Sequence, residues 1–175
     1  PWQRSYSTAR TQDNVLIYSI YRTPNREKFF HWICPLITSP LQSVYKLSSR
    51  KNLRINKEGD LNKYSFSVTR GTFIHKLLVN KGMKEGVNLF LTSSNKSNLQ
   101  MLLNNRVDFL VETEDAMVQM LASMKLPGET IEKVYTLKSR DQADLCMAIS
   151  KGTPSHIVDK IRSSHQALYP KTKLM

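Results

Sequence analysis

Apolar residues recur along the chain at two spacings, and these predict strands and helices in alternation. Short apolar runs and runs with every second residue apolar predict strands, at 15–21, 42–47, 64–68, 87–91, 107–111, 131–137 and 144–149. Apolar residues three and four positions apart predict helices, at 2–12, 73–80, 93–105, 113–124 and 153–168. Because strands and helices alternate, we expect an α/β protein with a mostly parallel sheet and helices on both faces.

Two segments interrupt this alternation. The prolines at both ends of residues 35–40 predict a loop. The polar and basic residues 48–60 predict a surface connection, with a short helix at 56–61. Both segments are therefore expected to lie outside the regular elements.

Methionines form a stripe on the helix predicted at 113–124. Met117, Met120 and Met124 share one helical face with Leu121. Methionine adapts its shape to irregular gaps in a hydrophobic core and also serves at promiscuous binding surfaces. We assign the stripe to the core.

The strand at 15–21 leads into the first candidate site. The turn Arg22-Thr23-Pro24-Asn25 follows it, and then a short charged segment that contains Arg26. Thr23 can cap this segment and Pro24 suits its first helical position. Ligands of open α/β sheets bind outside the carboxyl ends of strands, where a guanidinium can hold a carboxylate through two parallel hydrogen bonds.

A second candidate site lies where the strand at 64–68 meets the helix at 73–80. Arg70-Gly71-Thr72 fills this junction, with a glycine that permits a sharp turn and a threonine that can cap the helix. The backbone N–H groups at a helix N-terminus attract anions. The alternative is an ordinary capped helix without a ligand.

These motifs together resemble those of the type II periplasmic solute-binding proteins of ABC importers. The closest resemblance is to the amino-acid-binding group, extracellular solute-binding family 3. It rests on four motifs that follow in the family's order and spacing: T-x-x-R-E at 23–27, Arg70-Gly71-Thr72, Asn105-Arg106-Val107-Asp108, and Ala148-Ile149-Ser150-Lys151-Gly152. The resemblance implies two α/β lobes joined by hinge strands.

The resemblance also divides the chain. It places part of lobe I in residues 1–40, lobe II in 41–144, and a return to lobe I with the C-terminal helix in 145–175, with hinges near 38–44 and 144–149. Proteins of this family begin with a strand–helix–strand unit that precedes the residues present here. We therefore expect an incomplete lobe I, whose exposed sheet edge favours swapping, dimerisation or marginal stability.

Several ligand contacts are implied by the same resemblance. Arg26 corresponds to the arginine that holds the ligand's α-carboxylate. Ser19 and Tyr21 occupy strand positions that offer hydroxyl and backbone groups, and their spacing puts both on one face. The Arg70-Gly71-Thr72 junction corresponds to the part of lobe II that holds the same carboxylate.

The family's ammonium-binding acid has no direct counterpart. Its position falls on Thr113, which lies between Glu112 and Glu114. Either glutamate substitutes for the acid, or the ligand lacks an α-ammonium. The structural alternative for both is an acidic first turn, which stabilises a helix N-terminus. Asp108, in the preceding loop, is expected to be structural.

Composition and charge narrow the classes of function. The 175 residues carry a formal net charge of +12, but the Lys and Arg residues are scattered and the sequence has no nucleic-acid-binding motif. We therefore interpret the charge as a solubilising surface and expect no nucleic-acid partner. The sequence also lacks metal-ligand spacings, Walker, G-x-S-x-G and dinucleotide-binding motifs, so we expect no metal, no cofactor and no enzyme activity.

The cysteines and histidines are expected to be structural or exposed. Cys34 and Cys146 each lie in an apolar run. An oxidising compartment would allow a disulfide between them, but apolar surroundings favour buried free thiols, which we expect. His31 lies in an aromatic run and is expected to be structural, and the three histidines on helices are expected to face solvent.

The sequence thus predicts an extracytoplasmic, periplasmic solute-binding protein. It would capture a small carboxylate-bearing, amino-acid-like solute in a cleft between the lobes and deliver it to the permease of an ABC transporter. Ligand contacts to both lobes would drive closure about the hinges. The first alternative is the ligand-sensing domain of a signalling receptor with the same fold. An enzyme related to dehydratases and a nucleic-acid binder are weaker alternatives.

Overall fold

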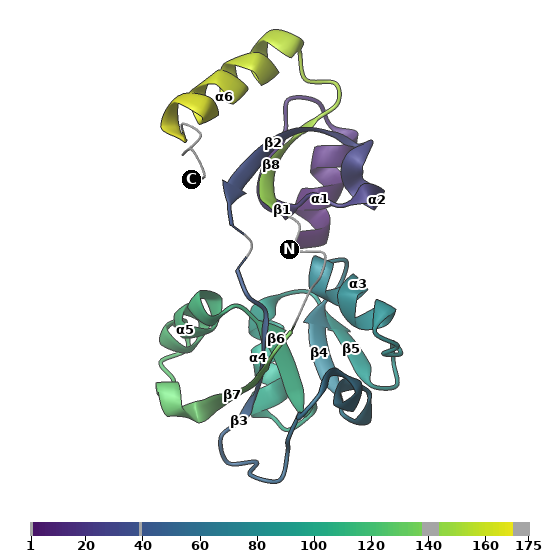
Figure 1. Cartoon of the computed structure of the whole chain (residues 1–175), viewed down its shortest axis with the longest axis vertical. Helices are drawn as coiled ribbons and strands as arrows, with labels where there is room; N and C mark the ends of the chain where they lie inside the picture. Colours follow the sequence, from purple (N-terminus) through teal and green to yellow (C-terminus); the bar gives the residue numbers. More distant parts are fainter. Residues whose placement is uncertain (1, 39, 138–143, 170–175) are drawn as a thin grey trace. The chain divides into compact units, whose positions relative to one another are not determined.

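The computed structural model describes residues 2–38, 40–137 and 144–169. The chain divides into two compact units. Unit 1 holds residues 1–3 and 40–140, and unit 2 holds residues 4–39 and 141–175. The elements of both units are labelled in Figure 1.

Unit 2 is built on an antiparallel sheet. Within the described residues the sheet has three strands in the order β1-β8-β2, and β8 pairs antiparallel with both neighbours. The strands are β1 (Leu16–Tyr21), β2 (Phe30–Ile37) and β8 (Leu145–Ser150), and the helices are α1 (Trp2–Thr11), which belongs to this unit from Arg4 onward, α2 (Pro24–Glu27) and α6 (Ser155–Leu168). Buried Ile33, Ile149 and Val158 join β2, β8 and α6 in one core cluster.

Strand β2 continues through Pro35 to Ile37, where the sequence predicted a loop. Proline lacks the N–H that a central strand must donate, so it is tolerated on edge strands and at irregular pairings. In the described part of the sheet β2 is an outer strand, and its register with β8 shifts between Ile33 and Ile37. The loop prediction failed because it ignored the strand's position in the sheet.

Unit 1 is built on a mixed sheet. In the residues described, its order is β5-β4-β6-β3-β7. The strands are β3 (Ser43–Leu47), β4 (Phe66–Thr69), β5 (Leu89–Thr92), β6 (Phe109–Glu112) and β7 (Ile131–Thr136). The helices are α3 (Phe73–Asn80), α4 (Asn95–Leu103) and α5 (Glu114–Ser123), with 3-10 turns at Glu58–Lys63 and Gly128–Thr130.

The prediction of a mostly parallel sheet was wrong. Strand β4 is parallel to β5 and β6, because helices α3 and α4 form the crossovers between these strands. Strand β3 is antiparallel to both β6 and β7, and unit 2 is antiparallel wherever its strands pair. The parallel part of the fold is therefore confined to β5-β4-β6.

Two apolar cores cover the two faces of the unit 1 sheet. Successive strand residues point to opposite faces, and Val44 and Tyr45 accordingly belong to different cores. One core includes Leu78 of α3, and the other includes α4 and α5. Helices therefore cover both faces, as predicted.

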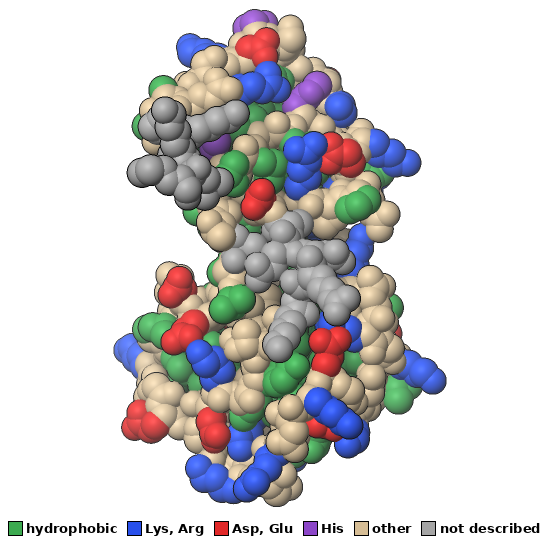
Figure 2. All heavy atoms as spheres, viewed as in Figure 1, with side chains coloured by type: hydrophobic (Ala, Val, Ile, Leu, Met, Phe, Trp, Pro, Cys, Tyr) green, Lys and Arg blue, Asp and Glu red, His purple; other side chains and the backbone are tan. Residues whose placement is uncertain are grey.

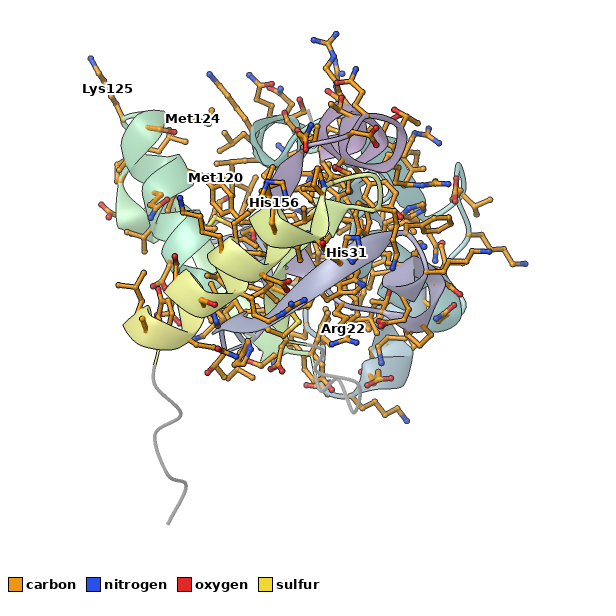
Figure 3. All side chains as sticks on the ribbon, turned by 90° about the horizontal axis from the view of Figure 1, so that it is seen from above. Arg22, His31, Met120, Met124, Lys125 and His156 are labelled. Atoms are coloured by element: carbon orange, nitrogen blue, oxygen red, sulfur yellow. A yellow bond between two sulfur atoms is a disulfide. The ribbon has the colours of Figure 1, made fainter. Side chains whose placement is uncertain are left out.

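The methionine stripe belongs to the second of these cores. Met117 and Leu121 are buried in it, and Met120 and Met124 pack against it. The side chains of Met120, on α5, and Met124, directly after it, are labelled in Figure 3. The assignment of the stripe to the core is confirmed.

Cys34 and Cys146 form a disulfide, so the expectation of two free thiols was wrong. Cys34 lies in β2 and Cys146 in the neighbouring β8, with their Cα atoms 4.7 Å apart. This separation lies within the range that a disulfide requires. The apolar runs around the two cysteines indicated burial, but only the pairing of β2 with β8 makes them neighbours.

Charged side chains are distributed over both units. Figure 2 shows Lys and Arg side chains over the visible face of each unit, with Asp and Glu among them. Among the described residues, no helix combines the length and the apolar character needed to cross a membrane.

Candidate functional site

Arg26, the predicted carboxylate ligand, lies in α2 of unit 2 and is 3 % exposed. Pro24 occupies the first turn of α2, as predicted, but Thr23 at the N-cap makes no side-chain capping bond. The Arg26 Nη1 donates to the carbonyl oxygen of Tyr21 at 3.0 Å. The strand end and the turn thus hold this guanidinium in place.

Tyr6 of α1 lies against the Arg26 guanidinium. The Arg26 Cζ is 5.2 Å from the centre of the Tyr6 ring, within the range of a cation–π contact. Burial lowers the pKa of Arg26, and the charge interaction and hydrogen bond with Tyr6 oppose this shift. Tyr6 also contacts Arg10, whose Cζ is 5.7 Å from the ring centre, and Phe30, whose ring centre is 5.9 Å from that of Tyr6.

Ser19 and Tyr21 both lie on β1, but the strand is irregular between them. Ser19 has a φ of 56°, and the register with β8 shifts between Ile17 and Ile20, which are both buried. The simple alternation that would put Ser19 and Tyr21 on one face is therefore interrupted. Ser19 is exposed and Tyr21 is half-buried.

In unit 1, Arg70-Gly71-Thr72 forms the predicted turn into α3. Gly71 has a φ of 74°, a conformation that favours glycine. Thr72 is the N-cap, and its Oγ1 accepts a hydrogen bond from the backbone N–H of His75 at 3.2 Å and donates to the Thr69 carbonyl at 2.8 Å. The Gly71 carbonyl accepts from Nε1 of Trp2 at 3.1 Å.

His75 is a constituent of this turn that the sequence analysis missed. Its Nδ1 accepts the backbone N–H of Gly71 at 3.1 Å, and its Nε2 lies 3.0 Å from Oε1 of Glu85. Because Nδ1 accepts, the ring proton is on Nε2 and points at Glu85. The sequence feature that could have indicated this contact is the position of His75 in the first turn of the helix that begins after Thr72.

The expectation of solvent-facing helical histidines was therefore wrong for His75. It was also wrong for His165 of α6, which is buried and has its Nε2 2.8 Å from the Pro35 carbonyl oxygen. His156 is exposed, as expected. Periodicity assigns a helical face, but it does not reveal that a loop or strand lies over that face.

Glu112 ends β6 and is bound through both carboxylate oxygens. Its Oε1 accepts the backbone N–H of Thr113 at 2.9 Å, and its Oε2 accepts Nδ2 of Asn95. Burial raises the pKa of Glu112, and these two hydrogen bonds oppose the rise. Glu112 is thus a half-buried carboxyl group, with both oxygens hydrogen-bonded, at the carboxyl end of a strand that is parallel to β4.

Glu114 has a different environment. Its side chain is 70 % exposed and forms an ion pair with Lys133 of β7 at 2.7 Å, and the hydrogen bond from Lys133 lowers the pKa of Glu114. Thr113 between the two glutamates caps α5, with its Oγ1 3.3 Å from the Ala116 nitrogen. Of the two glutamates, Glu112 is therefore the stronger ligand candidate.

Asp108 is structural, as expected. Its Oδ2 accepts the backbone N–H and the hydroxyl of Ser65 at 2.9 and 2.7 Å. Its Oδ1 forms an ion pair with Arg50 at 2.9 Å. Both carboxylate oxygens thus tie the start of β6 to neighbouring loops.

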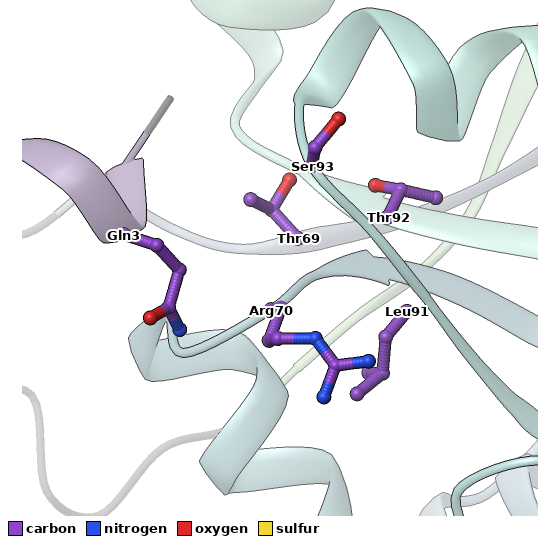
Figure 4. A pocket seen from close by; sticks show the side chains of 6 residues that line it. All are labelled: Gln3, Thr69, Arg70, Leu91, Thr92 and Ser93. Atoms are coloured by element: carbon purple, nitrogen blue, oxygen red, sulfur yellow. The ribbon is translucent and has the colours of Figure 1, made fainter.

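Arg70 lines a depression beside the same strand ends. The depression has a volume of about 280 Å³ and is lined by Gln3, Thr69, Arg70, Leu91, Thr92 and Ser93. Figure 4 shows the Arg70 side chain extending toward Leu91, with Thr69 and Ser93 on the other side. The guanidinium is exposed, so an anion can reach it.

The parallel strands bring the two parts of the unit 1 site to one edge. Strand β4 runs into the Arg70-Gly71-Thr72 turn and β6 ends at Glu112, and their register pairs Phe66 with Phe109. Continued along both strands, this register puts Thr69 beside Glu112. One edge of unit 1 therefore presents a cationic turn next to an anionic carboxyl group.

Comparison with known proteins identifies the fold. No protein-family model matches the sequence, and no curated protein matches it significantly. A histidine kinase sensor domain with similarity to periplasmic binding proteins superposes with a TM-score of 0.77 at 16% identity, over 98% of this chain and 70% of its own.

Two arginine-binding proteins also superpose. An arginine transport periplasmic binding protein from Legionella pneumophila gives a TM-score of 0.74 at 16% identity, over 95% of this chain and 72% of its own. An ancestral arginine-binding protein bound to arginine gives a TM-score of 0.70 at 17% identity, over 94% of this chain and 70% of its own. The chain thus has the type II fold of amino-acid-binding periplasmic proteins, as the resemblance implied. It carries a disulfide, a bond typical of oxidising compartments.

Proposed function

We propose that this protein binds a small amino-acid-like solute in the periplasm and passes it to the permease of an ABC transporter. The observation that carries the proposal is the pairing of opposite charges at one edge of unit 1, at the Arg70-Gly71-Thr72 turn and at Glu112. A zwitterionic ligand has a carboxylate that the Arg70-Gly71-Thr72 turn can bind and an ammonium group that Glu112 can bind. Structural relatives that were solved with arginine and with glutamine support this choice of ligand class.

The two units have different roles in this proposal. Unit 2 corresponds to lobe I, in which Arg26 holds the ligand's carboxylate and Ser19 and Tyr21 offer hydroxyl and backbone groups. Unit 1 corresponds to lobe II, in which the Arg70-Gly71-Thr72 turn contacts the carboxylate. Glu112, with Thr113 at the start of α5, receives the ammonium. We propose no metal, no cofactor and no catalytic step.

Isothermal titration of the purified protein with L-arginine and L-glutamine tests the proposal. Arg26→Lys keeps the charge but removes the planar fork, and Glu112→Gln removes the charge at nearly constant volume. We expect each variant to weaken binding about tenfold or more, because truncating one partner of a desolvated charge pair costs about 2–5 kcal/mol.

Glu114→Gln is the matched control for Glu112→Gln. It neutralises a neighbouring glutamate whose partner is Lys133 on the surface, and we expect unchanged affinity. Equal affinities of the Glu112 and Glu114 variants would refute the site. Failure of the wild-type protein to bind any of the common amino acids would refute the ligand class.

A receptor sensor domain is the second candidate, favoured by the similarity to the histidine kinase sensor domain. The two candidates share the ligand site and differ in what receives the signal. A gene that continues beyond Met175 into a membrane helix and a kinase region would favour the sensor. An adjacent permease gene whose product binds the ligand-loaded protein would favour transport.

A further inference from the structure

We propose that Asn95 is a positioning residue for Glu112. Its hydrogen bond holds the Glu112 carboxylate so that this carboxylate can bind the ligand's ammonium group. Glu112 would thereby replace the acid that is expected at the position of Thr113. The inference rests on the proposed function and deepens it. It assigns a role to Asn95, at the start of α4, which has no role in holding the ligand's carboxylate.

A continuous chain of hydrogen bonds leads to Asn95. Oγ1 of Thr92 donates to Oδ1 of Asn98 and is also 3.1 Å from the Ser94 carbonyl. Nδ2 of Asn98 donates to Oγ1 of Thr69 at 3.1 Å. Oγ1 of Thr69 donates its one proton to Oδ1 of Asn95 at 2.8 Å.

This chain fixes the orientation of the Asn95 amide. Because Oδ1 accepts from Thr69, the amide NH₂ group must point the other way, where it donates to Oε2 of Glu112. Every donor in the chain is thus directed toward Glu112. Chains of aligned hydrogen bonds polarise one another, which strengthens the last bond.

The chain ends on a half-buried carboxyl group that accepts a hydrogen bond on each oxygen. Burial raises the pKa of Glu112, and the bonds from Asn95 and from the Thr113 N–H oppose this rise by favouring the charged form. These bonds use two of the roughly four lone-pair sites of a carboxylate. The remaining sites can accept N–H groups from a cationic ligand.

The register of the strands explains why helix α4 supplies the hydrogen-bond partner of Glu112. Thr69 ends β4 and lies beside the end of β6, and Asn95 is the first residue of α4, after the Ser94 N-cap. Asn98, one turn later, is buried under the same strand ends. The first turn of α4 therefore bridges the ends of β4 and β6.

The test combines two measurements on the whole chain. Carbon NMR of the side-chain carboxyl groups gives the titration midpoint of Glu112, and calorimetry gives the affinities for L-arginine and for 5-guanidinopentanoate, which is arginine without its α-amino group. The variants are Asn95→Ala, which deletes the donor, and Asn95→Asp, which puts a carboxylate in its place. Asn104→Ala, an exposed residue at the end of the same helix, is the control.

We expect both Asn95 variants to raise the Glu112 midpoint, and Asn95→Asp to raise it more because like charges repel. Arginine affinity should fall most at pH values below the Glu112 midpoint, by about tenfold for each unit of midpoint shift, and should approach the wild-type value at pH values above the midpoint. The affinity for 5-guanidinopentanoate should change less than about twofold, and Asn104→Ala should change neither quantity.

Two results would overturn the inference. If the wild type binds arginine and Asn95→Ala leaves the Glu112 midpoint unchanged, the role of Asn95 is refuted. The proposed function would not be affected by that result. Equal losses for arginine and for its deaminated analogue would show that Asn95 only supports the fold. Wild-type protein that binds neither probe would instead refute the proposed function, and with it the ligand role of Glu112.

Discussion

Cys34 and Cys146 join the two strands through which the chain leaves unit 2 and returns to it. They are 112 residues apart, and the loop that they close contains residues 40–140 of unit 1. Residues 40–140 are therefore an insertion whose flanking strands, β2 and β8, are covalently tied together in unit 2. The cross-link acts on a sheet that has three strands in the part of the chain described.

Removal of this disulfide should destabilise unit 2. The double substitution Cys34→Ala and Cys146→Ala is expected to lower the free energy of unfolding by about 2–5 kcal/mol, because the open chain gains conformational entropy when it unfolds. Urea denaturation followed by circular dichroism measures the change. A reductant should lower the stability of the wild type and leave the double variant unchanged; a wild type that is insensitive to reduction would contradict the prediction.

The hydroxyl of Tyr6 should stabilise the buried Arg26. Tyr6→Phe keeps the ring over the guanidinium and removes the hydrogen bond. Hydrogen bonds to charged groups contribute about 1.5–3 kcal/mol, so we expect a loss of about that size in urea denaturation. Tyr18→Phe alters an exposed tyrosine on β1 and should have no effect; equal stabilities of the two variants would show that Tyr6 contributes through its ring alone.

His75 should be present as the tautomer with its proton on Nε2. Nitrogen NMR of the imidazole should show an unprotonated Nδ1, because this atom accepts the Gly71 N–H. His75→Ala leaves that N–H without its acceptor and should cost about 1–2 kcal/mol of stability. His156→Ala changes an exposed histidine on α6, labelled in Figure 3, and serves as the control. A protonated Nδ1 at neutral pH would contradict the proposed contact.

Asp60 should make unit 1 sensitive to acid. Hydrogen bonds from Lys63 and from the backbone N–H groups of Lys57 and Asn56 lower the pKa of Asp60 from 3.8 to about 2. A carboxyl group with a depressed pKa stabilises the fold fully above its unfolded value, and this contribution is lost as the pH falls through the folded value. Thermal unfolding between about pH 5 and pH 2 should therefore show a loss of stability.

Asp60→Asn should flatten that pH dependence, because the amide does not titrate. Glu129→Gln, at an exposed glutamate in the 3-10 turn Gly128–Thr130, should retain the pH dependence. A wild-type profile and an Asp60→Asn profile that run parallel across this pH range would show that other carboxyl groups cause the acid sensitivity.

The elements with local signals were predictable from the sequence. Helix α3 spans residues 73–80 as predicted, because its apolar spacing, the Thr72 cap and the Gly82 stop all lie within or next to the helix. The strand predicted at 107–111 and the helix predicted at 113–124 likewise agree with β6 and α5 to within one or two residues at each end. Resemblance to known motifs supplied the fold class, which the structural comparisons confirm.

Pairings between distant segments required the tertiary structure. The disulfide depends on β2 lying beside β8, and the passage of β2 through Pro35 depends on its outer position in the sheet. Sequence periodicity reports which residues are buried, but it does not report which strands are neighbours or in which direction they run. For this reason the prediction of a mostly parallel sheet was wrong while the strand positions were largely right.

The candidate site divides in the same way. The sequence by itself determined that acidic residues flank Thr113 at the end of a buried strand, and it marked Arg26 and the Arg70-Gly71-Thr72 turn. It did not distinguish Glu112 from Glu114, since both sit at the same strand-to-helix junction. Only the fold brings Asn95 to one glutamate and Lys133 to the other, because hydrogen-bond partners and solvent exposure depend on segments that meet only when the chain folds.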